Sequence, residues 1–292
     1  MNYPIERLQP FTLHVGLARH HADWNWKNVR SPFARLYLVT EGEAEVILPS
    51  GTCHLTPGHL YYIPAFTTHS YVCKATFTHY YIHILEKQGE PSVLEELILP
   101  TEVVAHRLDY DLMERLAYLN PFLKLPTSNP QGYDNPETVV NNIQMNVKRP
   151  FCDKVESRGI LFMLLSRFLK LAKPKVDLTD SRILQALHYI RQHLTERIDI
   201  SSLAEMCCMS NDHFIRLFKR AMGDTPVSFI TQRRMEQAEL LLVCRQQPLK
   251  EVALQSGYDD YSYFHKLFKK HVGVTPQLYR EQCKIPATLS EE

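Results

Sequence analysis

Two different hydrophobic patterns divide the chain into an N-terminal and a C-terminal half. From residue 11 to about residue 85, apolar and polar side chains alternate in short runs such as Phe77–Leu85, separated by turns containing Gly or Pro. Turns spaced about 8–12 residues apart between such runs are typical of a β-sandwich or a small barrel. From Ser181 to Lys284, apolar residues instead recur at helical spacing almost throughout. We therefore predict an α+β protein of two domains.

The segment between these halves is expected to be mainly helical. Ser92–Ile98 and Asp109–Leu119 could each form a helix, and Lys154–Lys173 carries a wide apolar face at helical spacing. That face either packs on the N-terminal strands or pairs with its twin in a dimer. The turn-rich stretch Leu125–Pro136 is expected to be a surface loop, and Lys173-Pro174-Lys175 is expected to be a linker.

An internal repeat is the strongest signal in the C-terminal half. Phe214-Ile-Arg-Leu-Phe-Lys219 returns 50 positions later as Phe264-His-Lys-Leu-Phe-Lys269, and Gly, Thr and Pro follow each copy. Each copy predicts a short helix, a tight turn and a second helix with a polar, basic outer side, which is the helix-turn-helix plan. The polar side chains expected on the outer sides include Asn211 and Lys219 in the first copy and Lys269 in the second.

Caps and turn residues agree with this plan. Gly257 is expected to supply the left-handed residue at the turn of the second copy. Asp259 or Asp260 is expected to cap the helix that follows it, and Ser201 or Ser202 to cap the first helix of the first copy.

The region of the repeat is also basic. Between His213 and Lys284 there are 12 Lys and Arg residues and 7 Asp and Glu residues, so the net charge is 12 − 7 = +5, whereas the whole chain carries +1. Contact with nucleic-acid phosphates requires such a charge. One amphipathic helix over Thr231–Cys244 would hold the two modules at a fixed separation, so that both recognition helices could enter successive major-groove segments about 34 Å apart.

The C-terminal hundred residues resemble the DNA-binding domain of the AraC/XylS family of bacterial transcription regulators. The resemblance spans Ile198–Arg280 and is carried by positions in both copies, among them Leu203-Ala204, Ser210, Phe218-Lys219, Gly223, Thr225-Pro226, Arg234, Val252-Ala253, Gly257-Tyr258, Phe268-Lys269-Lys270, Gly273 and Thr275-Pro276. It implies that the outer sides of both second helices face DNA base edges. The predicted DNA-binding residues are Asn211, Asp212, Ile215, Arg216 and Lys219 in the first module, and Tyr261, Ser262, His265, Lys266 and Lys269 in the second.

The β-rich segment resembles the cupin-like, sugar-sensing arm of the same family. Gly42, the stretch Leu55–Pro64, His69 and the stretch His79–His83 carry this resemblance. It implies a cupin-like β-barrel around a ligand pocket. Imidazole and aromatic groups together suit a sugar, whose hydroxyl groups need polar partners and whose ring has an apolar side. The predicted ligand-binding residues are Arg35, Tyr37, His69, Tyr71, His79 and Tyr81.

Alternation along one strand determines which side chains face the pocket. Phe77, His79, Tyr81 and His83 share one face of this strand, and the intervening residues share the other, so the opposite register remains an alternative. Trp24 and its near neighbour Trp26 could stack on a ligand or belong to the core.

Catalytic and metal-binding motifs are sparse. Metal-binding cupins usually take an HxH pair and a Glu from a first motif and a His from a second, but Leu36–Leu48 contains no His, and only His69 fits the second motif. A three-His site formed by His69, His79 and His83 is the alternative. No GxSxG, HExxH, P-loop or GxGxxG motif is present. We therefore expect no enzymatic activity, no metal and no cofactor.

Cysteine usage and apolar runs bear on the compartment. The chain has seven Cys and no CxxC pair, which argues against a disulfide framework and for a reducing environment. Ile160–Leu165 is much shorter than the roughly 18–20 apolar residues that a membrane span needs. The start lacks the pattern of a signal peptide. We expect a cytoplasmic protein with no membrane partner.

Together these patterns predict a bacterial one-component DNA-binding transcription regulator, with activation as the commoner outcome in the resembling family. Residues 1–175 are expected to form a cupin-like sensing and dimerisation domain, helical over about 92–173. Residues 176–292 are expected to bind DNA through modules at about 198–230 and 248–280. The expected partners are double-stranded operator DNA, a small-molecule effector such as a sugar, RNA polymerase if the protein activates, and a second copy in a homodimer.

Three alternatives remain at this stage. The signal could be a non-sugar compound, such as an aromatic metabolite or a stress compound. The protein could be a metal-dependent cupin enzyme fused to a DNA-binding tail. It could also be a regulator governed by protein contacts, with an empty barrel.

Overall fold

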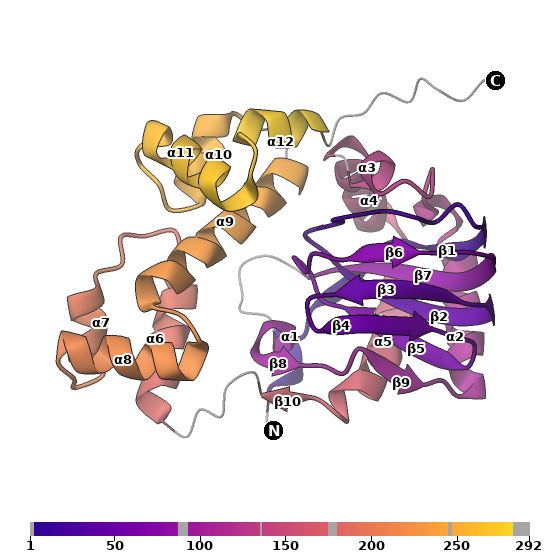
Figure 1. The fold of residues 1–292 in the computed structure, drawn as a ribbon, viewed down its shortest axis with the longest axis horizontal. Coiled ribbons are helices and arrows are strands. Elements are labelled where there is room, and N and C mark those ends of the chain that lie inside the picture. The colour runs from indigo at the N-terminus through magenta and orange to yellow at the C-terminus, as the bar shows by residue number, and fades with distance from the viewer. Residues whose placement is uncertain (1–2, 87–92, 135, 175–179, 245–246, 283–292) are drawn as a thin grey trace. The chain divides into compact units, whose positions relative to one another are not determined.

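The computed structural model describes residues 3–86, 93–134, 136–174, 180–244 and 247–282 (Figure 1). Contacts divide the chain into two compact units. The sheet unit consists mainly of Gln9–Lys87 and Leu99–Ala172, and the helical unit consists mainly of Lys173–Glu281. The described parts of Met1–Leu8 and Gln88–Ile98 belong to the helical unit. Of the predicted linker Lys173-Pro174-Lys175, Lys173 and Pro174 form a short strand, and only Lys175 lies outside the described residues.

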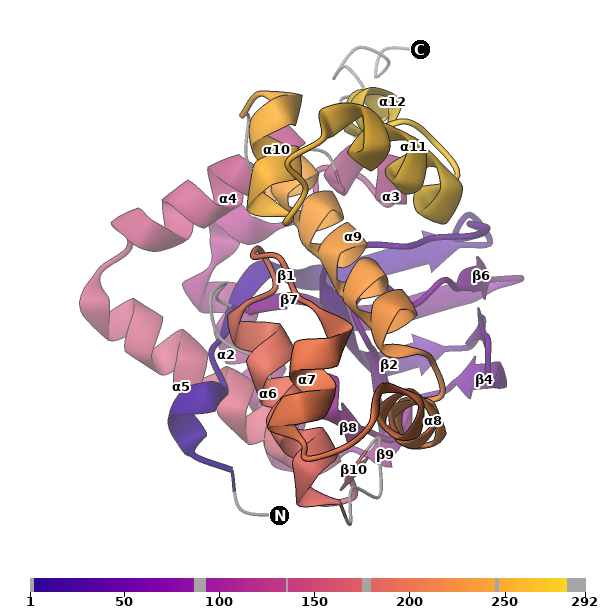
Figure 2. The ribbon, with the colours of Figure 1, turned by 90° about the vertical axis from the view of Figure 1, so that its left-hand side faces the viewer.

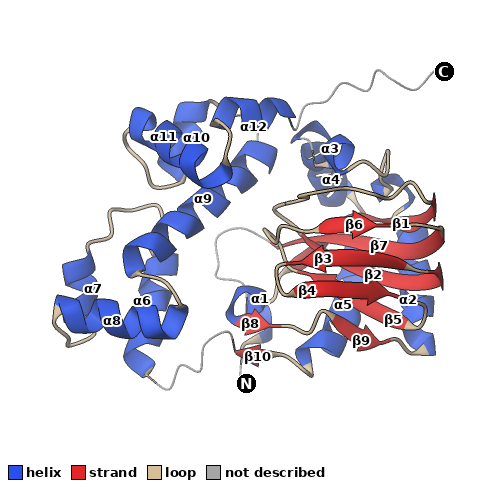
Figure 3. Cartoon of the chain, viewed as in Figure 1, coloured by secondary structure: helices blue, strands red, loops and turns tan. Residues whose placement is uncertain are grey.

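Two antiparallel sheets pack face to face in the sheet unit (Figure 3). The larger sheet has the strand order β1 (Pro10–His21), β7 (Thr76–Glu86), β2 (Ala34–Gly42), β5 (His59–Ile63) and β9 (Glu102–Val104). The smaller sheet has the order β4 (Gly51–Leu55), β3 (Ala44–Leu48) and β6 (Ser70–Val72). Val46 and Leu55 from the smaller sheet share one buried cluster with Val39, Tyr61 and Phe77 from the larger one. This shared core accounts for the alternating pattern of the N-terminal half.

The predicted barrel is not closed in the described residues. β1 and β9 remain the edges of the larger sheet, and β1 is covered by helices instead of pairing with a further strand. Asn142 and Asn146 of α4 (Pro136–Lys148) donate side-chain hydrogen bonds to the main-chain oxygens of Leu13 and Thr12, at 3.1 and 2.9 Å. These amides satisfy carbonyl groups that a neighbouring strand would satisfy in a closed sheet, so the protein has two packed sheets with a covered edge.

Helices of the middle segment cover this sheet. The predicted helix over Asp109–Leu119 is confirmed as α2 (Arg107–Leu119), and the long apolar helix forms as α5 (Phe151–Leu169). The apolar face of α5 is buried and packs on its own sheet, where Phe168 lies 5.6 Å from the ring of Tyr62. Exposed apolar residues of α5, Phe151, Val155 and Met163, lie elsewhere on the helix and leave the dimer alternative open.

Two expectations for the middle segment were wrong in detail. The stretch Leu125–Pro136 is not simply a surface loop, because it contains α3 (Pro130–Tyr133), and the Tyr133 side chain is buried against the sheet. The helix expected over Ser92–Ile98 is confined to α1 (Val93–Glu96) among the described residues, because Leu97–Ile98 forms strand β8. β8 pairs with β10 (Lys173–Pro174) in the helical unit.

The helical unit contains the internal repeat. Its helices are α6 (Ser181–Gln192), α7 (Ile200–Met206), α8 (Asn211–Met222), α9 (Pro226–Cys244), α10 (Leu249–Gln255), α11 (Tyr261–Val272) and α12 (Pro276–Gln282). The remaining short elements are the 3-10 helices η1 (Ile5–Arg7) and η2 (Pro121–Leu123). Among the described residues, no helix is both long and apolar enough to cross a membrane.

Candidate nucleic-acid interface and ligand pocket

The first repeat folds as a helix-turn-helix, from α7 through a tight turn to α8. Phe214, Leu217 and Phe218 of α8 pack with Leu203 and Ala204 of α7 in one buried cluster. This cluster uses the apolar stripe that the repeat predicts and leaves the other side of α8 facing outward.

Local residues set the ends of these two helices. The Ser210 hydroxyl accepts a hydrogen bond from the His213 N–H at 3.4 Å at the start of α8, and Gly223 ends that helix with φ +78°. α7 is capped by Asp199, which accepts from the Ser202 N–H at 2.9 Å, and not by Ser201 or Ser202 as expected. The Asp199 carboxylate, two residues upstream of Ser201, accepts from an N–H group of the first turn, so α7 begins earlier than the serines suggest.

The second repeat has the same layout in α10 and α11. Gly257 adopts φ +82° at the turn, as predicted, and a Cβ atom there would lie 2.8 Å from the main-chain oxygen of Leu194. Asp260 caps α11, because its carboxylate accepts from the N–H groups of Ser262 and Tyr263 at 2.7 and 3.0 Å. Phe264 and Phe268 are fully buried beneath the outer side of α11. Because of its positive φ and the close approach of the Leu194 oxygen, the position of Gly257 admits only a residue without a side chain.

One continuous helix, α9, joins the two modules (Figure 2). Its Phe229 and Ile230 belong to the core of the first module, and its Leu241 and Leu242 belong to the core of the second. From the middle of α9, the Arg234 guanidinium donates to the main-chain oxygen of Leu194 at 2.8 Å and to that of Glu196, and it lies 5.3 Å from the ring of Tyr258. Shared cores and this bridging arginine hold the modules at a fixed separation, in agreement with the spacer prediction.

The predicted DNA-binding residues lie on the outer sides of α8 and α11. Exposed among them are Asn211, Asp212, Arg216, Lys219, Ser262, Lys266 and Lys269, and half-buried are Ile215, Tyr261 and His265. Among the described residues, the Arg216 guanidinium makes one hydrogen bond, at 3.3 Å to the main-chain oxygen of Asp212. These two surfaces therefore offer cations and hydrogen-bonding groups of the kind that read base edges and phosphates.

Sequence reasoning missed Tyr263 as a candidate for the interface. Its neighbour Phe264 is buried, whereas the Tyr263 side chain is 57% exposed beside Ser262 and Lys266. A helical period of 3.6 residues places two adjacent aromatic residues at different depths, and packing decides which is inside. Tyr263 therefore joins the candidate interface.

A small pocket of about 210 Å³ opens on the inner side of the larger sheet. We call it the inner pocket, and it is lined by Leu17, Ala18, Arg19, His20, Trp24, Tyr37, His79, Tyr81, His83, Leu125, Thr127, Ser128 and Tyr133. Three of the predicted ligand-binding residues, Tyr37, His79 and Tyr81, thus lie together around one cavity. The register with Phe77, His79, Tyr81 and His83 inside is confirmed for the two histidines and the tyrosine that line it.

Two further predicted ligand-binding residues, Tyr71 and His69, lie behind the side chains that line the inner pocket. The Tyr71 hydroxyl lies 2.6 Å from the Tyr37 hydroxyl and 2.7 Å from His69 Nε2, and His69 Nδ1 lies 2.7 Å from the main-chain oxygen of Thr67. Burial and the nearby Arg35 lower the pKa of His69 to about 3, so the imidazole is neutral. Its Nδ1 must donate to the Thr67 carbonyl, so Nε2 accepts from Tyr71, and Tyr71 in turn accepts from Tyr37. The chain of bonds leaves one orientation for the Tyr37 hydroxyl.

His79 and Tyr81 have different roles at the pocket wall. His79 is buried, its pKa is lowered well below the usual value by burial, and in the described structure its Nδ1 has no hydrogen-bond partner. The Tyr81 hydroxyl accepts a hydrogen bond from the Leu125 N–H at 2.9 Å and lies where a Cβ atom on Gly16 would be. His79 therefore retains hydrogen-bonding capacity for a guest, whereas Tyr81 fixes the segment that forms the mouth of the pocket.

Arg35 does not line the inner pocket. It is buried, donates to the Ser31 hydroxyl at 2.6 Å and lies 3.8 Å from the Asp134 carboxylate. Burial raises the pKa of Asp134 to about 6, against the opposing effect of the Arg35 charge. Ser31 also donates to Asp134. Sequence reasoning missed Asp134 and its neighbour Tyr133, because only the tertiary fold brings the turn-rich segment onto the sheet.

The remaining candidates belong to the core beside the pocket. The Trp24 ring stacks on Tyr71 with centroids 3.9 Å apart and lines the cavity, whereas Trp26 packs against the same cluster from outside. Within the described residues, no group of three His, Cys, Asp or Glu side chains is placed to hold a metal ion.

Comparison with known proteins places the repeat in a family. A model described as a helix-turn-helix domain matches residues 203–282. An arabinose operon regulatory protein from Salmonella typhimurium is 36% identical over 106 residues, which cover 36% of this chain and 38% of that protein. Through this domain the chain belongs to the AraC/XylS family of transcription regulators.

Other similar proteins differ in how much of the chain they cover. A lactose operon transcription activator from Staphylococcus xylosus is 23% identical over 86% of this chain and 84% of its own length. The solved C-terminal domain of the response regulator yesN from Fusobacterium nucleatum is 30% identical, covers 35% of this chain and 99% of that domain, and has a TM-score of 0.34. The chain spans little more than a third of the length of the arabinose regulator that it matches.

Proposed function

We propose that the protein is a transcription regulator that binds operator DNA with α8 and α11 and responds to a small polar molecule held in the inner pocket. Two helix-turn-helix modules fixed on α9, each with an exposed basic recognition side, carry this proposal. We assign sensing and dimerisation to residues 1–175 and DNA binding to residues 176–292.

The proposed effector is a monosaccharide or a derivative of similar size. The inner pocket, at about 210 Å³, is smaller than the roughly 300–1,000 Å³ of sites for drug-sized ligands, so it suits a single ring. Trp24, Tyr37 and His79 supply apolar faces and hydrogen-bonding groups at its wall. Relatives named as regulators of the arabinose and xylose operons and as a transcription activator of the lactose operon support a sugar signal and an activating role. In that role the protein would act together with RNA polymerase.

DNA binding is tested with the full chain on sites selected from a random-sequence library. We expect Arg216→Ala and Lys266→Ala each to weaken specific binding by about 1–3 kcal/mol, because each removes a group placed to contact base edges. Lys250→Ala, an exposed cation at the start of α10, is the matched control and is expected to change affinity little. Unchanged affinity in both recognition-helix variants would overturn the placement of the interface.

The effector is tested by calorimetric titration of the full chain with mono- and disaccharides. Saturable binding of one monosaccharide that is lost in His79→Ala would support the sugar proposal. Binding of an aromatic metabolite instead, with no sugar bound, would favour the alternative signal. Stoichiometric metal that confers turnover would favour the cupin-enzyme alternative.

A further inference from the structure

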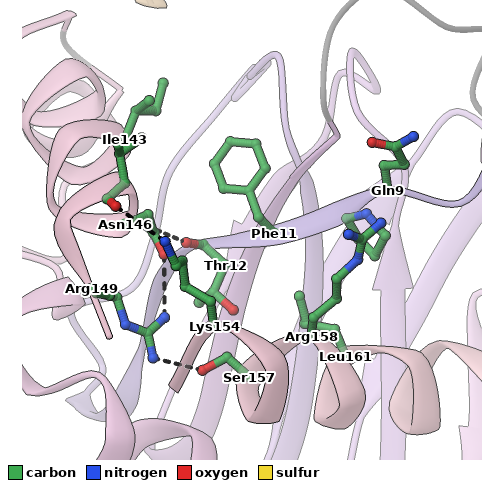
Figure 4. Close-up of a pocket in the computed structure, with 12 residues that line it drawn as sticks. Gln9, Phe11, Thr12, Ile143, Asn146, Arg149, Lys154, Ser157, Arg158 and Leu161 are labelled. Carbon is green, nitrogen blue, oxygen red and sulfur yellow. Dashed lines mark hydrogen bonds between the residues drawn. The ribbon is translucent and has the colours of Figure 1, made fainter. Parts of the chain in front are cut away.

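A second cavity lies on the outer side of the sheet unit, between the edge strand β1 and helices α4 and α5 (Figure 4). Its volume is about 380 Å³, within the range of about 300–1,000 Å³ that is usual for small-molecule sites. We call it the outer cavity, and it is lined by Gln9, Pro10, Phe11, Thr12, Ile143, Asn146, Val147, Arg149, Lys154, Ser157, Arg158 and Leu161. It shares no lining residue with the inner pocket, so it is a separate candidate site.

One part of the outer cavity is apolar. Phe11 contributes an aromatic ring from β1, Ile143 and Val147 contribute aliphatic side chains from α4, and Leu161 contributes a fully buried side chain from α5. Val147 is 70% exposed, so the apolar wall reaches solvent at the mouth of the cavity. An apolar body entering here would remove these groups from water, which is favourable.

The polar part of the lining is positively charged. Arg149, Lys154 and Arg158 contribute three cations, and no Asp or Glu lines the cavity within the described part of the chain. Lys154 is exposed and makes a 3.3 Å hydrogen bond to the main-chain oxygen of Val147. The cavity therefore selects against cations and favours an anionic group.

Arg149 is the most constrained of these cations. Only 8% of the residue is exposed, and its guanidinium donates to Ser157 Oγ at 2.8 Å and to Asn146 Oδ1 at 3.4 Å (Figure 4). It also donates to the main-chain oxygen of Asp153 at 3.1 Å, so all three acceptors are neutral oxygens. Its Nε has no partner, and no ion pair joins it to a carboxylate among residues 3–86, 93–134, 136–174, 180–244 and 247–282. Burial lowers the pKa of Arg149, and the Asp153 charge offsets this in part.

A second unpartnered polar atom lies at the same cavity. The hydroxyl of Thr12, a residue that is 2% exposed, has no hydrogen-bond partner in the described structure. A buried cation with no carboxylate in ion-pair contact and a buried hydroxyl without a partner both cost free energy, and a bound anion would offset part of this cost. Both residues line the outer cavity next to its apolar wall.

We propose that the outer cavity binds a small organic anion, an aliphatic or aromatic monocarboxylate whose apolar body lies on Phe11, Ile143 and Leu161. The carboxylate lies at Arg149 and Lys154, and a bound anion connects α4 and α5 with the edge of β1. This site is independent of the proposed sugar pocket, and its test does not require DNA.

The test is calorimetric titration of the full chain with octanoate and with benzoate, each compared with its neutral counterpart, 1-octanol or benzyl alcohol. We expect saturable binding of at least one of the two anions. We expect its neutral counterpart to bind at least about tenfold more weakly, because it carries no charge to pair with Arg149 and Lys154.

Four variants locate the binding. Ile143→Trp fills the apolar part and is expected to abolish binding, Lys154→Gln is expected to weaken it several-fold, and Arg149→Gln is expected to weaken it at least about tenfold, equivalent to about 1.4 kcal/mol. Lys170→Gln, at an exposed cation near the end of α5 that does not line the cavity, is the matched control and is expected to leave affinity unchanged.

The outcomes separate the alternatives. If Arg149→Gln fails to fold, Ile143→Trp and Lys154→Gln still decide, since both positions are partly or fully exposed. The proposal is overturned if neither anion binds saturably, if the alcohols bind as tightly as the anions, or if Ile143→Trp retains full affinity. Loss of anion binding with sugar binding intact would confirm two separate sites.

Discussion

At Tyr81 a single hydroxyl group connects the sheet to the segment at the mouth of the inner pocket. It accepts a hydrogen bond from the Leu125 N–H at 2.9 Å, and the side chain is only 5% exposed. We expect Tyr81→Phe to weaken effector binding by about tenfold, because a buried N–H left without a partner costs about 1–3 kcal/mol and releases this segment. Calorimetric titration with the effector measures the loss.

The matched control for this change is Tyr80→Phe. Tyr80 precedes Tyr81 on β7, is half-buried and does not line the inner pocket. We expect it to leave effector affinity unchanged. Equal losses in the two variants would mean that the effect arises from general destabilisation of β7 and not from the pocket mouth.

Buried imidazoles make the sheet unit sensitive to acid. Burial, together with Arg35, lowers the pKa of His14 and of His69 to about 3, and burial lowers those of His79 and His83 well below the usual value. In the unfolded chain each imidazole binds its proton near pH 6.5. The free energy of unfolding is therefore highest, as far as these imidazoles are concerned, above about pH 6.5. It decreases as the pH falls toward about 3, by up to about 1.4 kcal/mol per imidazole for each pH unit.

Asp134 acts in the opposite direction, because its pKa is raised to about 6 by burial and its protonation adds stability as the pH falls through that value. Four imidazoles outweigh one carboxyl group, so we expect the unfolding midpoint to fall between about pH 7 and about pH 5. Both Trp residues of the chain lie in the sheet unit, so tryptophan fluorescence during thermal denaturation reports this unit alone. A midpoint that rises or stays constant on acidification would contradict the assignment of neutral buried imidazoles.

Single residues also show what the sequence could and could not reveal. Tyr37, His79 and Tyr81 follow from strand alternation, which is a local property of the chain. The contribution of Tyr133 and the role of Asp134 could not be read in the same way, because their segment has no regular period and is buried only through contacts with residues about 50–120 positions away. The outer cavity exists only when β1, α4 and α5 are packed together, so no local sequence pattern predicts it.

At the scale of elements, the turn of the second module depends on one glycine. Gly257 and Gly273 both have positive φ, at +82° and +91°, but only at Gly257 would a Cβ atom meet main-chain atoms, at 2.8 Å from the Leu194 oxygen. We expect Gly273→Ala to cost about 1–2 kcal/mol for its left-handed backbone alone, and Gly257→Ala to cost clearly more. Chemical denaturation of the full chain, followed by far-UV circular dichroism, measures both.

The comparison of these two variants isolates the effect of the close approach, since the backbone penalty is common to both. Equal costs would mean that the Leu194 segment moves aside freely and that Arg234, which binds the same oxygen, does not fix it. The helices of the repeat were predictable because glycine stops, aspartate caps and apolar stripes all act within one turn of the chain. The covered edge of β1 was not, because its closing hydrogen bonds come from Asn142 and Asn146, more than 100 residues away.

At the scale of the whole molecule, the geometry of α9 determines which operators can be bound. α9 has 19 residues, and a helix of that length spans about 28 Å. Because its two ends belong to the cores of different modules, the two recognition helices cannot change their separation without breaking a core. We therefore expect the selected operator to contain two contact segments about one helical turn, or about 34 Å, apart.

This rigidity can be tested on the DNA alone. Insertion of about 5 base pairs between the two segments rotates one of them by half a turn, and insertion of about 10 base pairs restores the rotation but moves it one turn further away. We expect both insertions to reduce the affinity of the full chain to that for non-specific DNA, whereas the same insertions outside the two segments change nothing. Affinity recovered by the longer insertion would show that α9 bends or that the modules separate, because only a flexible joint could follow a segment displaced by a full turn.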